Sequence, residues 1–259
     1  MITGHNYVMR TRLLILGGTT EATALAHALD GDPRLAVVTS LAGRTRSPVL
    51  PPGEARIGGF GGVEGLATYL GEAHIDLVID ATHPFAATIS GNAAAACAQA
   101  GVPRAMLVRP AWERQAGDDW RMVDTMEAAA TALLDGIHRV FLTIGRQELA
   151  PFARVTESWF LIRTIDQPEP MPAIHHHRLI LARGPFALEN EFALLREERI
   201  DRIVAKHSGG AATYAKLAAA RQLGIPVILL KRPSPPDGTI LPSVAAAIGW
   251  VGDHAGSPG

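Results

Sequence analysis

A glycine-rich segment near the start of the chain has the composition of a phosphate-binding turn. Residues 13–22 read Leu-Leu-Ile-Leu-Gly-Gly-Thr-Thr-Glu-Ala, which is an apolar run, a turn and the start of a helix. Glycines allow a ligand to approach the backbone, and the positive end of a helix favours a pyrophosphate. The full G-x-G-x-x-G pattern is absent, so a tight turn with a threonine cap is the alternative. The predicted dinucleotide contacts are Gly17, Gly18, Thr19, Thr20 and Glu21, although Glu21 could bond backbone amides instead.

The segment after the second apolar run favours NADPH over NADH. NAD-binding folds place an acidic residue about 20 residues past the glycines, where it holds the ribose 2′-hydroxyl. Here residues 40–46 read Ser-Leu-Ala-Gly-Arg-Thr-Arg, and the next carboxylate is Glu54. Hydroxyl and guanidinium groups suit a 2′-phosphate. We therefore predict contacts from Ser40, Arg44, Thr45 and Arg46; a solvated basic loop is the alternative.

A third polar segment follows another apolar run. Residues 80–86 read Asp-Ala-Thr-His-Pro-Phe-Ala, and ligands of open α/β sheets bind at the carboxyl ends of strands. Pro84 favours an extended backbone at His83, a candidate for contact with the nicotinamide end or the substrate. Thr82 is predicted to contact the cofactor or to cap the next helix. A lone histidine is more often structural, and that reading stays open.

A matching segment lies in the second half of the chain. Residues 205–216 read Ala-Lys-His-Ser-Gly-Gly-Ala-Ala-Thr-Tyr-Ala-Lys, another turn of small residues between a strand and a helix. Such a turn could bind an anion or let a bulky ligand approach the backbone. We predict that it contributes to a ligand site through Lys206, His207, Ser208, Gly209 and Gly210. An ordinary turn with an exposed lysine is the alternative.

The elements that must position these residues alternate between short apolar strands and Ala/Leu-rich helices, which indicates parallel sheets covered on both faces. In the first half we expect strands near 12–16, 35–39, 55–57, 76–80 and 104–108, with helices near 20–29, 63–73 and 85–100. In the second half we expect strands near 139–143, 159–164, 178–182, 202–206 and 227–230, and residues 118–124 as the connection.

The two halves resemble weak copies of each other. Residues 12–21 align with 139–148, residues 74–83 with 199–208, and Gln99-Ala-Gly-Val-Pro103 with Gln222-Leu-Gly-Ile-Pro226. Because these anchors keep their order at nearly constant offsets, they favour duplication over a chance likeness of strand–helix units. The predicted fold is α/β, with two Rossmann-like halves, parallel sheets and a cleft between them. The expected domains are 11–115, which binds NADPH, and 136–250, which contributes to a substrate cleft; exchange of a strand between them is left open.

Composition excludes several classes of protein. The formal net charge is −1, which gives no general attraction to nucleic acid or anionic membranes, and no apolar run is long enough for a transmembrane helix. One cysteine, Cys97, cannot form an internal disulfide, so a cytoplasmic protein is expected. The adjacent histidines 175–177 lack nearby cysteine or carboxylate ligands, and we predict no metal site.

Taken together, residues 14–22, 80–86 and 206–216 resemble the precorrin-6A reductase family of cobalamin biosynthesis. Residues 224–233, Gly-Ile-Pro-Val-Ile-Leu-Leu-Lys-Arg-Pro, are also similar to that family. The resemblance spans roughly residues 12–233. Each motif is modest alone, but their joint order is rather specific.

The resemblance implies an NADPH-dependent oxidoreductase that reduces precorrin-6A to precorrin-6B, with hydride transfer to C19 and protonation at C18 of the macrocycle. The tetrapyrrole substrate carries many carboxylates, so cations are expected to bind it. The candidate cations are Arg109, Arg183, Lys206 and Arg232. The candidate catalytic residues are His83, Lys206 and His207, and solvent could also supply the proton. Neighbouring pathway enzymes are candidate partners.

Three other functions stay open at this point. The resemblance also covers the cobalt-containing substrate, which the sequence does not separate from the metal-free one. Another NADPH-dependent oxidoreductase of the extended Rossmann group would usually carry Tyr-x-x-x-Lys, but Ala218 follows Tyr214 at that spacing. A non-catalytic nucleotide sensor would need only the first turn.

Overall fold

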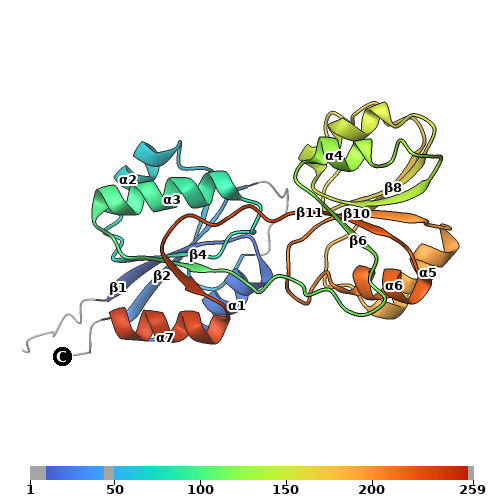
Figure 1. Ribbon diagram of the computed structural model, residues 1–259. Helices are drawn as coiled ribbons and strands as arrows, with labels where there is room; N and C mark the ends of the chain where they lie inside the picture. The colour runs from blue at the N-terminus through green and yellow to red at the C-terminus, as the bar shows by residue number, and fades with distance from the viewer. Residues whose placement is uncertain (1–9, 44–49, 256–259) are drawn as a thin grey trace, which may run out of the picture. The chain divides into compact units, whose positions relative to one another are not determined.

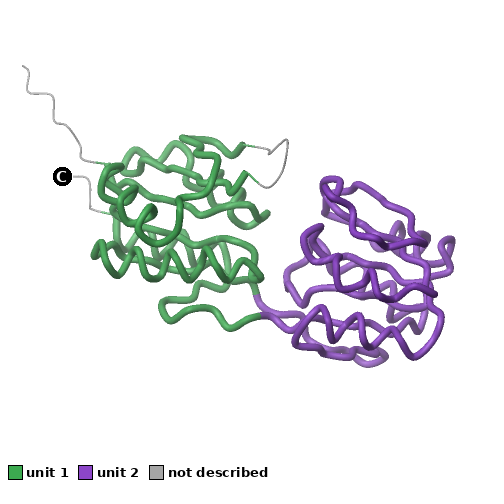
Figure 2. The backbone as a smooth tube through the Cα atoms, turned by 90° about the horizontal axis from the view of Figure 1, so that it is seen from above, with its two compact units in different colours: residues 1–109, 233–259 green, residues 110–232 purple. Residues whose placement is uncertain are grey.

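The computed structural model describes residues 10–43 and 50–255, which divide into two compact units (Figure 2). Unit 1 consists of the chain up to Arg109 and from Pro233 onward, and unit 2 consists of Pro110–Arg232. Each unit contains one six-stranded sheet, and every strand pair in both sheets is parallel. The predicted α/β class with two Rossmann-like halves is confirmed.

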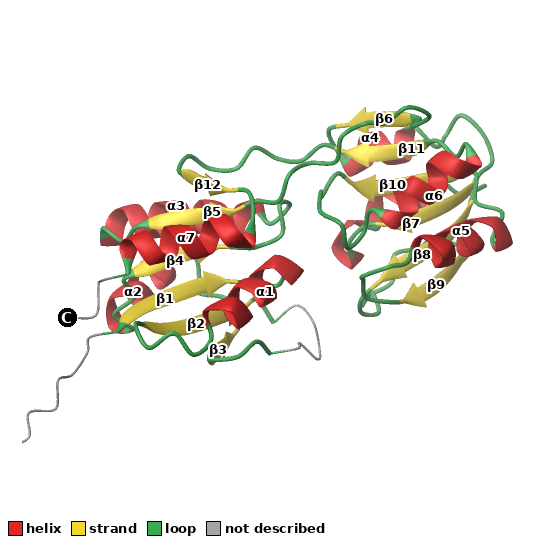
Figure 3. Cartoon of the chain, turned by 90° about the horizontal axis from the view of Figure 1, so that it is seen from below, coloured by secondary structure: helices red, strands yellow, loops and turns green. Residues whose placement is uncertain are grey.

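The sheet of unit 1 has the strand order β12-β5-β4-β1-β2-β3 (Figure 1). Its strands are β1 (Thr11–Leu16), β2 (Leu35–Leu41), β3 (Glu54–Ile57), β4 (Leu77–Asp80), β5 (Arg104–Leu107) and β12 (Thr239–Leu241). Its helices are α1 (Thr20–Leu29), α2 (Val63–Glu72), α3 (Ala87–Ala100) and α7 (Val244–His254). Figure 3 shows the helices on both faces of the sheet.

Alternation along the central strand explains the layers of unit 1. Leu13 and Ile15 of β1 pack against α1 and α7, whereas Leu14 and Leu16 pack against α2 and α3. All four side chains are buried, because a parallel sheet with helices on both faces needs apolar side chains on both sides of its strands.

The sheet of unit 2 has the strand order β6-β11-β10-β7-β8-β9. Its strands are β6 (Trp120–Val123), β7 (Arg139–Thr143), β8 (Trp159–Thr164), β9 (His177–Leu181), β10 (Arg202–Lys206) and β11 (Val227–Leu230). Its helices are α4 (Met126–Thr131), α5 (Leu188–Glu197) and α6 (Ala215–Leu223), with 3-10 turns η1 (Arg146–Glu148) and η2 (Ala150–Arg154). Helices α5 and α6 cover one face and α4 the other (Figure 1).

Both sheets follow the Rossmann order 3-2-1-4-5-6. In each sheet, however, the sixth strand is the one that follows the five strands of the other sheet in the sequence. Strand β6 follows β5 in sequence and joins the sheet of unit 2, while β12 follows β11 and joins the sheet of unit 1. The predicted duplication of architecture therefore agrees with the strand order, and the strand exchange that the sequence left open is present.

The unit boundaries differ from the expected domains 11–115 and 136–250. The chain enters unit 2 at Pro110, and residues 233–250 belong to unit 1. The expected connection at 118–124 contains a strand, β6. Both exchanged strands are short edge strands with exposed positions, so they lack the apolar run by which the central strands can be recognised.

No helix within the described parts of the chain has the length and apolar character needed to cross a membrane.

Candidate functional site

The turn between β1 and α1 lies at the carboxyl edge of the sheet in unit 1. Thr19 caps α1, because its Oγ1 accepts a hydrogen bond from the Ala22 N–H at 3.1 Å. The same hydroxyl donates to the Ala81 carbonyl, at the end of β4, at 2.7 Å. Gly18 has a φ of +109°, and a Cβ placed there would meet no atom within 4 Å. The turn thus offers a glycine backbone beside open space and the first N–H groups of a helix, which lack acceptors within the helix.

Ser40 supports this turn through its backbone rather than its hydroxyl. Strand β2 continues to Leu41, beyond the expected end at residue 39, and Ser40 is only 5% exposed within it. Its carbonyl accepts a hydrogen bond from the Gly17 N–H at 2.8 Å. The predicted contacts Arg44, Thr45 and Arg46 lie outside the described residues.

The segment after β4 is organised around a buried carboxylate. Asp80 is 4% exposed, and its Oδ1 accepts hydrogen bonds from the Thr82 hydroxyl at 2.6 Å and the Thr82 N–H at 3.1 Å. The first residue of α3 is Ala87, and no side chain caps this helix, so Thr82 does not have the capping role that was its alternative. His83 Nδ1 accepts a hydrogen bond from the Phe85 N–H at 3.3 Å, which leaves the proton of a neutral ring on Nε2.

Two residues predicted for different ligands contact each other in unit 1. Arg109 Nη1 lies 2.8 Å from Glu21 Oε2, and their side chains are 14% and 24% exposed. Arg109 was expected to bind substrate carboxylates and Glu21 to contact the cofactor. The ion pair fixes Arg109 beside the start of α1, and both ligand contacts stay predictions.

An equivalent pair lies at the carboxyl edge of unit 2. Lys206, the last residue of β10, forms an ion pair with Glu148 of η1, and the two side chains are 18% and 30% exposed. Glu148 was missed as a site residue, although the alignment of residues 12–21 with 139–148 places it opposite Glu21. In both units the carboxylate of the first turn therefore holds a cation predicted to bind substrate.

His207 is turned away from solvent by contacts with two tryptophans. Its Nε2–H donates to the Trp112 carbonyl at 3.0 Å, and its ring lies edge-on to Trp112 and Trp120 at 5.8 and 6.0 Å between centroids. Burial lowers the pKa of His207; the hydrogen bond to Trp112 opposes this effect, and the positive charge of Arg232 adds to it. His207 is therefore mainly neutral near pH 7.

The glycine turn after His207 is packed against protein rather than open. Gly209 has a φ of +70°, and a Cβ there would lie 2.1 Å from the Pro110 carbonyl oxygen and 2.4 Å from an Arg232 nitrogen. Arg232 Nη2 donates to the Ser208 carbonyl at 2.8 Å, and Ser208 is 6% exposed. Glycine is therefore required at position 209 because Pro110 and Arg232 approach its backbone closely. These two residues fill the space beside Gly209, so the glycine by itself does not indicate a ligand contact.

The structure brings most predicted residues to two sheet edges. At the edge of unit 1 these are Gly17, Gly18, Thr19, Thr20, Glu21, Thr82, His83 and Arg109. At the edge of unit 2 these are Lys206, His207, Ser208, Gly209, Gly210 and Arg232. Arg183, after β9, is exposed. The predicted cleft between the halves stays a prediction.

Other reactive groups within the described chain do not form a second site. No three His, Cys, Asp or Glu side chains gather there as a metal site would require. His177 lies in β9, and its Nδ1–H donates to the Ile174 carbonyl at 2.7 Å. Cys97 is buried in α3, and burial raises the pKa of its thiol to about 11, which keeps it protonated.

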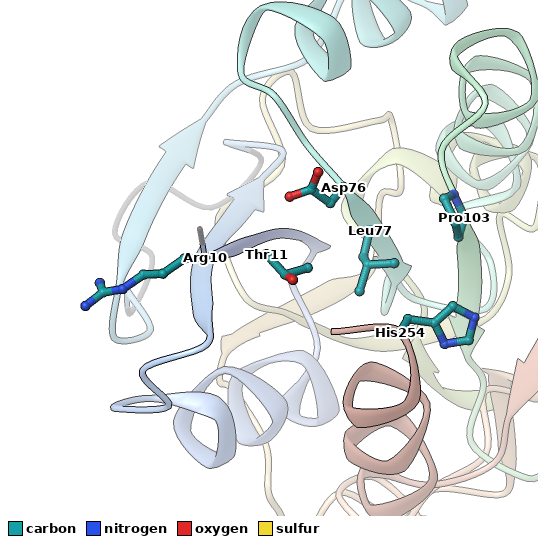
Figure 4. A pocket seen from close by; sticks show the side chains of 6 residues that line it. All are labelled: Arg10, Thr11, Asp76, Leu77, Pro103 and His254. Carbon is teal, nitrogen blue, oxygen red and sulfur yellow. The ribbon is translucent and has the colours of Figure 1, made fainter. Parts of the chain in front are cut away.

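A cavity of about 360 Å³ lies at the opposite edge of the same sheet in unit 1 (Figure 4). It is lined by residues at the amino ends of β1, β4 and β5 and at the end of α7: Arg10, Thr11, Asp76, Leu77, Pro103 and His254. Asp76 Oδ2 accepts a hydrogen bond from the Arg12 N–H at 2.7 Å, which assigns this carboxylate to strand alignment. Because it lies at the amino edge, the cavity is separate from the Gly17–Glu21 turn.

Comparison with known proteins agrees with the two-unit architecture. A family model described as precorrin-6x reductase CbiJ/CobK matches residues 12–252. A solved structure of CobK precorrin-6A reductase superposes with a TM-score of 0.91 at 48% identity, covering 96% of this chain and 98% of that one.

Named relatives differ in their similarity to this chain. A precorrin-6A reductase of Rhodococcus erythropolis is 52% identical, covering 93% of this chain and 98% of the relative. A cobalt-precorrin-6A reductase of Priestia megaterium is 28% identical, covering 88% of this chain and 93% of the relative.

Proposed function

Because the chain belongs to the precorrin-6x reductase CbiJ/CobK family, we infer that it is an NADPH-dependent precorrin-6A reductase of cobalamin biosynthesis. The observation that carries this inference is the 52% identity to a precorrin-6A reductase across nearly its whole length. The 28% identity to a cobalt-precorrin-6A reductase supports the metal-free substrate over the cobalt-containing one.

The turn of unit 1 fits the pyrophosphate of a dinucleotide. Gly18 leaves open space where a side chain would stand, and α1 begins directly after it with a threonine cap, so the positive end of the helix lies at this turn. We assign Gly17, Gly18, Thr19 and Thr20 to this group, while Ser40 supports the turn from β2. NADPH, when bound, supplies the hydride that the reduction needs.

Preference for NADPH rests on residues that follow β2. No carboxylate stands between Ser40 and Glu54, and the arginines at 44 and 46 can bind a 2′-phosphate. Replacing Arg44 and Arg46 by alanine is expected to weaken NADPH binding about tenfold or more, since a charge-assisted hydrogen bond contributes roughly 1.5–3 kcal/mol. An equal loss for NADH would contradict this assignment.

We assign Lys206 to the carboxylates of the macrocycle. Its ammonium group is held at the carboxyl edge of unit 2 by Glu148, in a partly exposed position where a substrate carboxylate can reach it. Arg109 is similarly fixed by Glu21 at the edge of unit 1. Pre-positioned cations lose little side-chain entropy on binding, so they can orient a substrate that carries many carboxylates.

His207 is a poor candidate for the proton donor, because its Nε2–H is already donated to the Trp112 carbonyl. We therefore propose that His207 does not protonate the macrocycle. We assign this role to His83, which follows β4 at the carboxyl edge of unit 1.

The direct test is anaerobic incubation of the protein with NADPH and precorrin-6A, followed by absorbance. The expected result is oxidation of NADPH in equal amount to substrate, with a change in the macrocycle spectrum. Lys206→Ala should raise KM for precorrin-6A about tenfold while the Kd of NADPH changes less than twofold. Lys231→Ala is the matched control, because Lys231 forms an exposed pair with Asp124. Absence of NADPH oxidation by the unmodified protein would overturn the assignment.

A further inference from the structure

Both ends of unit 2 contact the same short turn, His207–Gly210. At the entry, the Pro110 carbonyl lies against Gly209, where a Cβ would approach it to 2.1 Å. At the exit, Arg232 donates to the Ser208 carbonyl at 2.8 Å. This turn directly follows Lys206, the last residue of β10.

Trp112 is the main anchor of the entering segment. Its Nε1–H donates to the Gly210 carbonyl at 2.6 Å, and its own carbonyl accepts the Nε2–H of His207 at 3.0 Å. The Nζ of Lys216 lies 5.3 Å from the centroid of its ring, a distance at which a cation is attracted to an indole. Trp112 is 9% exposed, so these contacts form away from water. Two hydrogen bonds of opposite direction thus join Trp112 to both ends of the turn.

The surroundings of His207 suit a fixed neutral ring rather than a proton carrier. Besides Trp112, its ring faces Trp120, and its backbone N–H donates to the Leu230 carbonyl at 3.0 Å. Lys206 precedes it in the chain, and the positive charge of Arg232 also acts on it. Protonation of the ring would therefore place a positive charge near Arg232, which is unfavourable.

We propose that Trp112 and His207 are positioning residues that fix the His207–Gly210 turn and thereby hold Lys206 in place for the carboxylates of the substrate. This proposal rests on the proposed function, and it assigns to His207 a role that differs from proton donation. Neither residue needs to touch the macrocycle.

A pair of tryptophan variants isolates the decisive hydrogen bond. Trp112→Phe keeps an aromatic ring but loses the N–H that binds Gly210. Trp120→Phe is the matched control, because Trp120 contacts the same histidine while its buried Nε1 has no hydrogen-bond partner among the described residues. Loss of one hydrogen bond corresponds to a roughly three- to tenfold effect. We expect Trp112→Phe to raise KM for precorrin-6A by about that factor and Trp120→Phe to change it less than twofold.

Hydrogen exchange provides a readout that needs no substrate. In Trp112→Phe, the amides of the His207–Gly210 turn should exchange roughly three- to tenfold faster than in the unmodified protein. The same amides should be unaffected in Trp120→Phe, and the Kd of NADPH should stay within twofold in both variants. Equal exchange in the two variants would overturn the proposed anchor even if turnover of precorrin-6A is confirmed. Absence of turnover with faster exchange would instead overturn the proposed function alone.

Substitution of His207 separates positioning from proton donation. His207→Gln retains an N–H donor for the Trp112 carbonyl, whereas His207→Ala does not. We expect kcat of His207→Gln within about threefold of the unmodified protein, with an unchanged pH profile, and a KM increase in His207→Ala similar to that of Trp112→Phe. A loss of kcat of a hundredfold or more in His207→Gln, with KM unchanged, would show that His207 is the proton donor and overturn the proposal.

Discussion

Two carboxylates at equivalent positions each hold a candidate substrate-binding cation, one in each unit. Glu21 holds Arg109 in unit 1, and Glu148 holds Lys206 in unit 2. Neither cation is more than about a fifth exposed, with side-chain values of 14% and 18%. A partly buried cation held by one carboxylate is already oriented before an anionic ligand binds.

We expect cofactor binding to depend strongly on Gly18. Its φ of +109° strains any other residue, and the space beside it is open. Gly18→Ala should lower the free energy of unfolding by about 1–3 kcal/mol and weaken NADPH binding about tenfold or more, because the methyl group enters the space assigned to the pyrophosphate. Fluorescence titration with NADPH measures the second effect.

Gly31→Ala is the matched control for backbone strain. Gly31 has a φ of +81° with open space beside it, but it lies in the turn that leads into the amino end of β2. It should lose similar stability while its Kd for NADPH stays unchanged. Equal Kd values for the two variants would remove Gly18 from the cofactor site.

Contacts between residues close in the sequence could be predicted more readily than contacts between distant residues. Thr19 was correctly expected among the residues that cap α1, because threonine is a favoured residue at the start of a helix. The burial of Ser40 was missed because β2 runs two residues further than its apolar pattern. The packing of Pro110 against Gly209 joins residues far apart in the sequence, and no local pattern reports such a contact.

At the scale of elements, the central strands could be predicted closely. The expected strands 139–143, 159–164, 202–206 and 227–230 agree with β7, β8, β10 and β11, because strands buried on both faces are continuous apolar runs. The exchanged edge strands β6 and β12 have exposed positions and were missed. Their assignment depends on pairing with another part of the chain.

A buried ion pair links strand β8 to helix α5 in unit 2. Arg163 binds both oxygens of Glu191, at 2.5 and 2.8 Å, and the side chains are 7% and 3% exposed. Glu191→Gln should lower the free energy of unfolding by about 3–5 kcal/mol, because it leaves a buried guanidinium without its counter-charge. Denaturant unfolding measures this change.

Glu189→Gln provides the control on the same helix. Glu189 is exposed in the first turn of α5, so its replacement should change the free energy of unfolding by no more than about 0.5 kcal/mol. Combining Arg163→Met with Glu191→Leu should recover most of the loss, since an apolar pair needs no desolvation of charge. A small effect of Glu191→Gln alone would show that the pair is not a main stabilising contact.

At the scale of the whole molecule, the reciprocal exchange makes unit 1 depend on the end of the described chain. Leu241 of β12 and Val251 of α7 are buried in the same core cluster as Leu25 of α1. Helix α1 begins at the Gly17–Glu21 turn, so the packing of α7 supports the candidate cofactor site from a distance.

Val251→Asp tests this dependence. Val251 is 1% exposed, and a carboxylate there should destabilise unit 1 by about 3 kcal/mol or more and reduce NADPH binding at a temperature where the unmodified protein is folded. Ile248→Asp, on the same helix at a position 38% exposed, should have little effect on either quantity. Calorimetry of both variants measures the stability, and titration with NADPH measures the affinity. If Val251→Asp keeps full stability and full affinity for NADPH, the cofactor site does not depend on the packing of α7.

We expect this chain to reduce precorrin-6A with a hydride from NADPH. NADPH that carries deuterium on the transferred position of its nicotinamide ring tests this transfer. Mass spectrometry of the product formed under anaerobic conditions should find one deuterium in the macrocycle, and NADPH labelled on the other face should leave the product unlabelled. A product without deuterium from either label, or a label that appears in water, would contradict hydride transfer to the macrocycle.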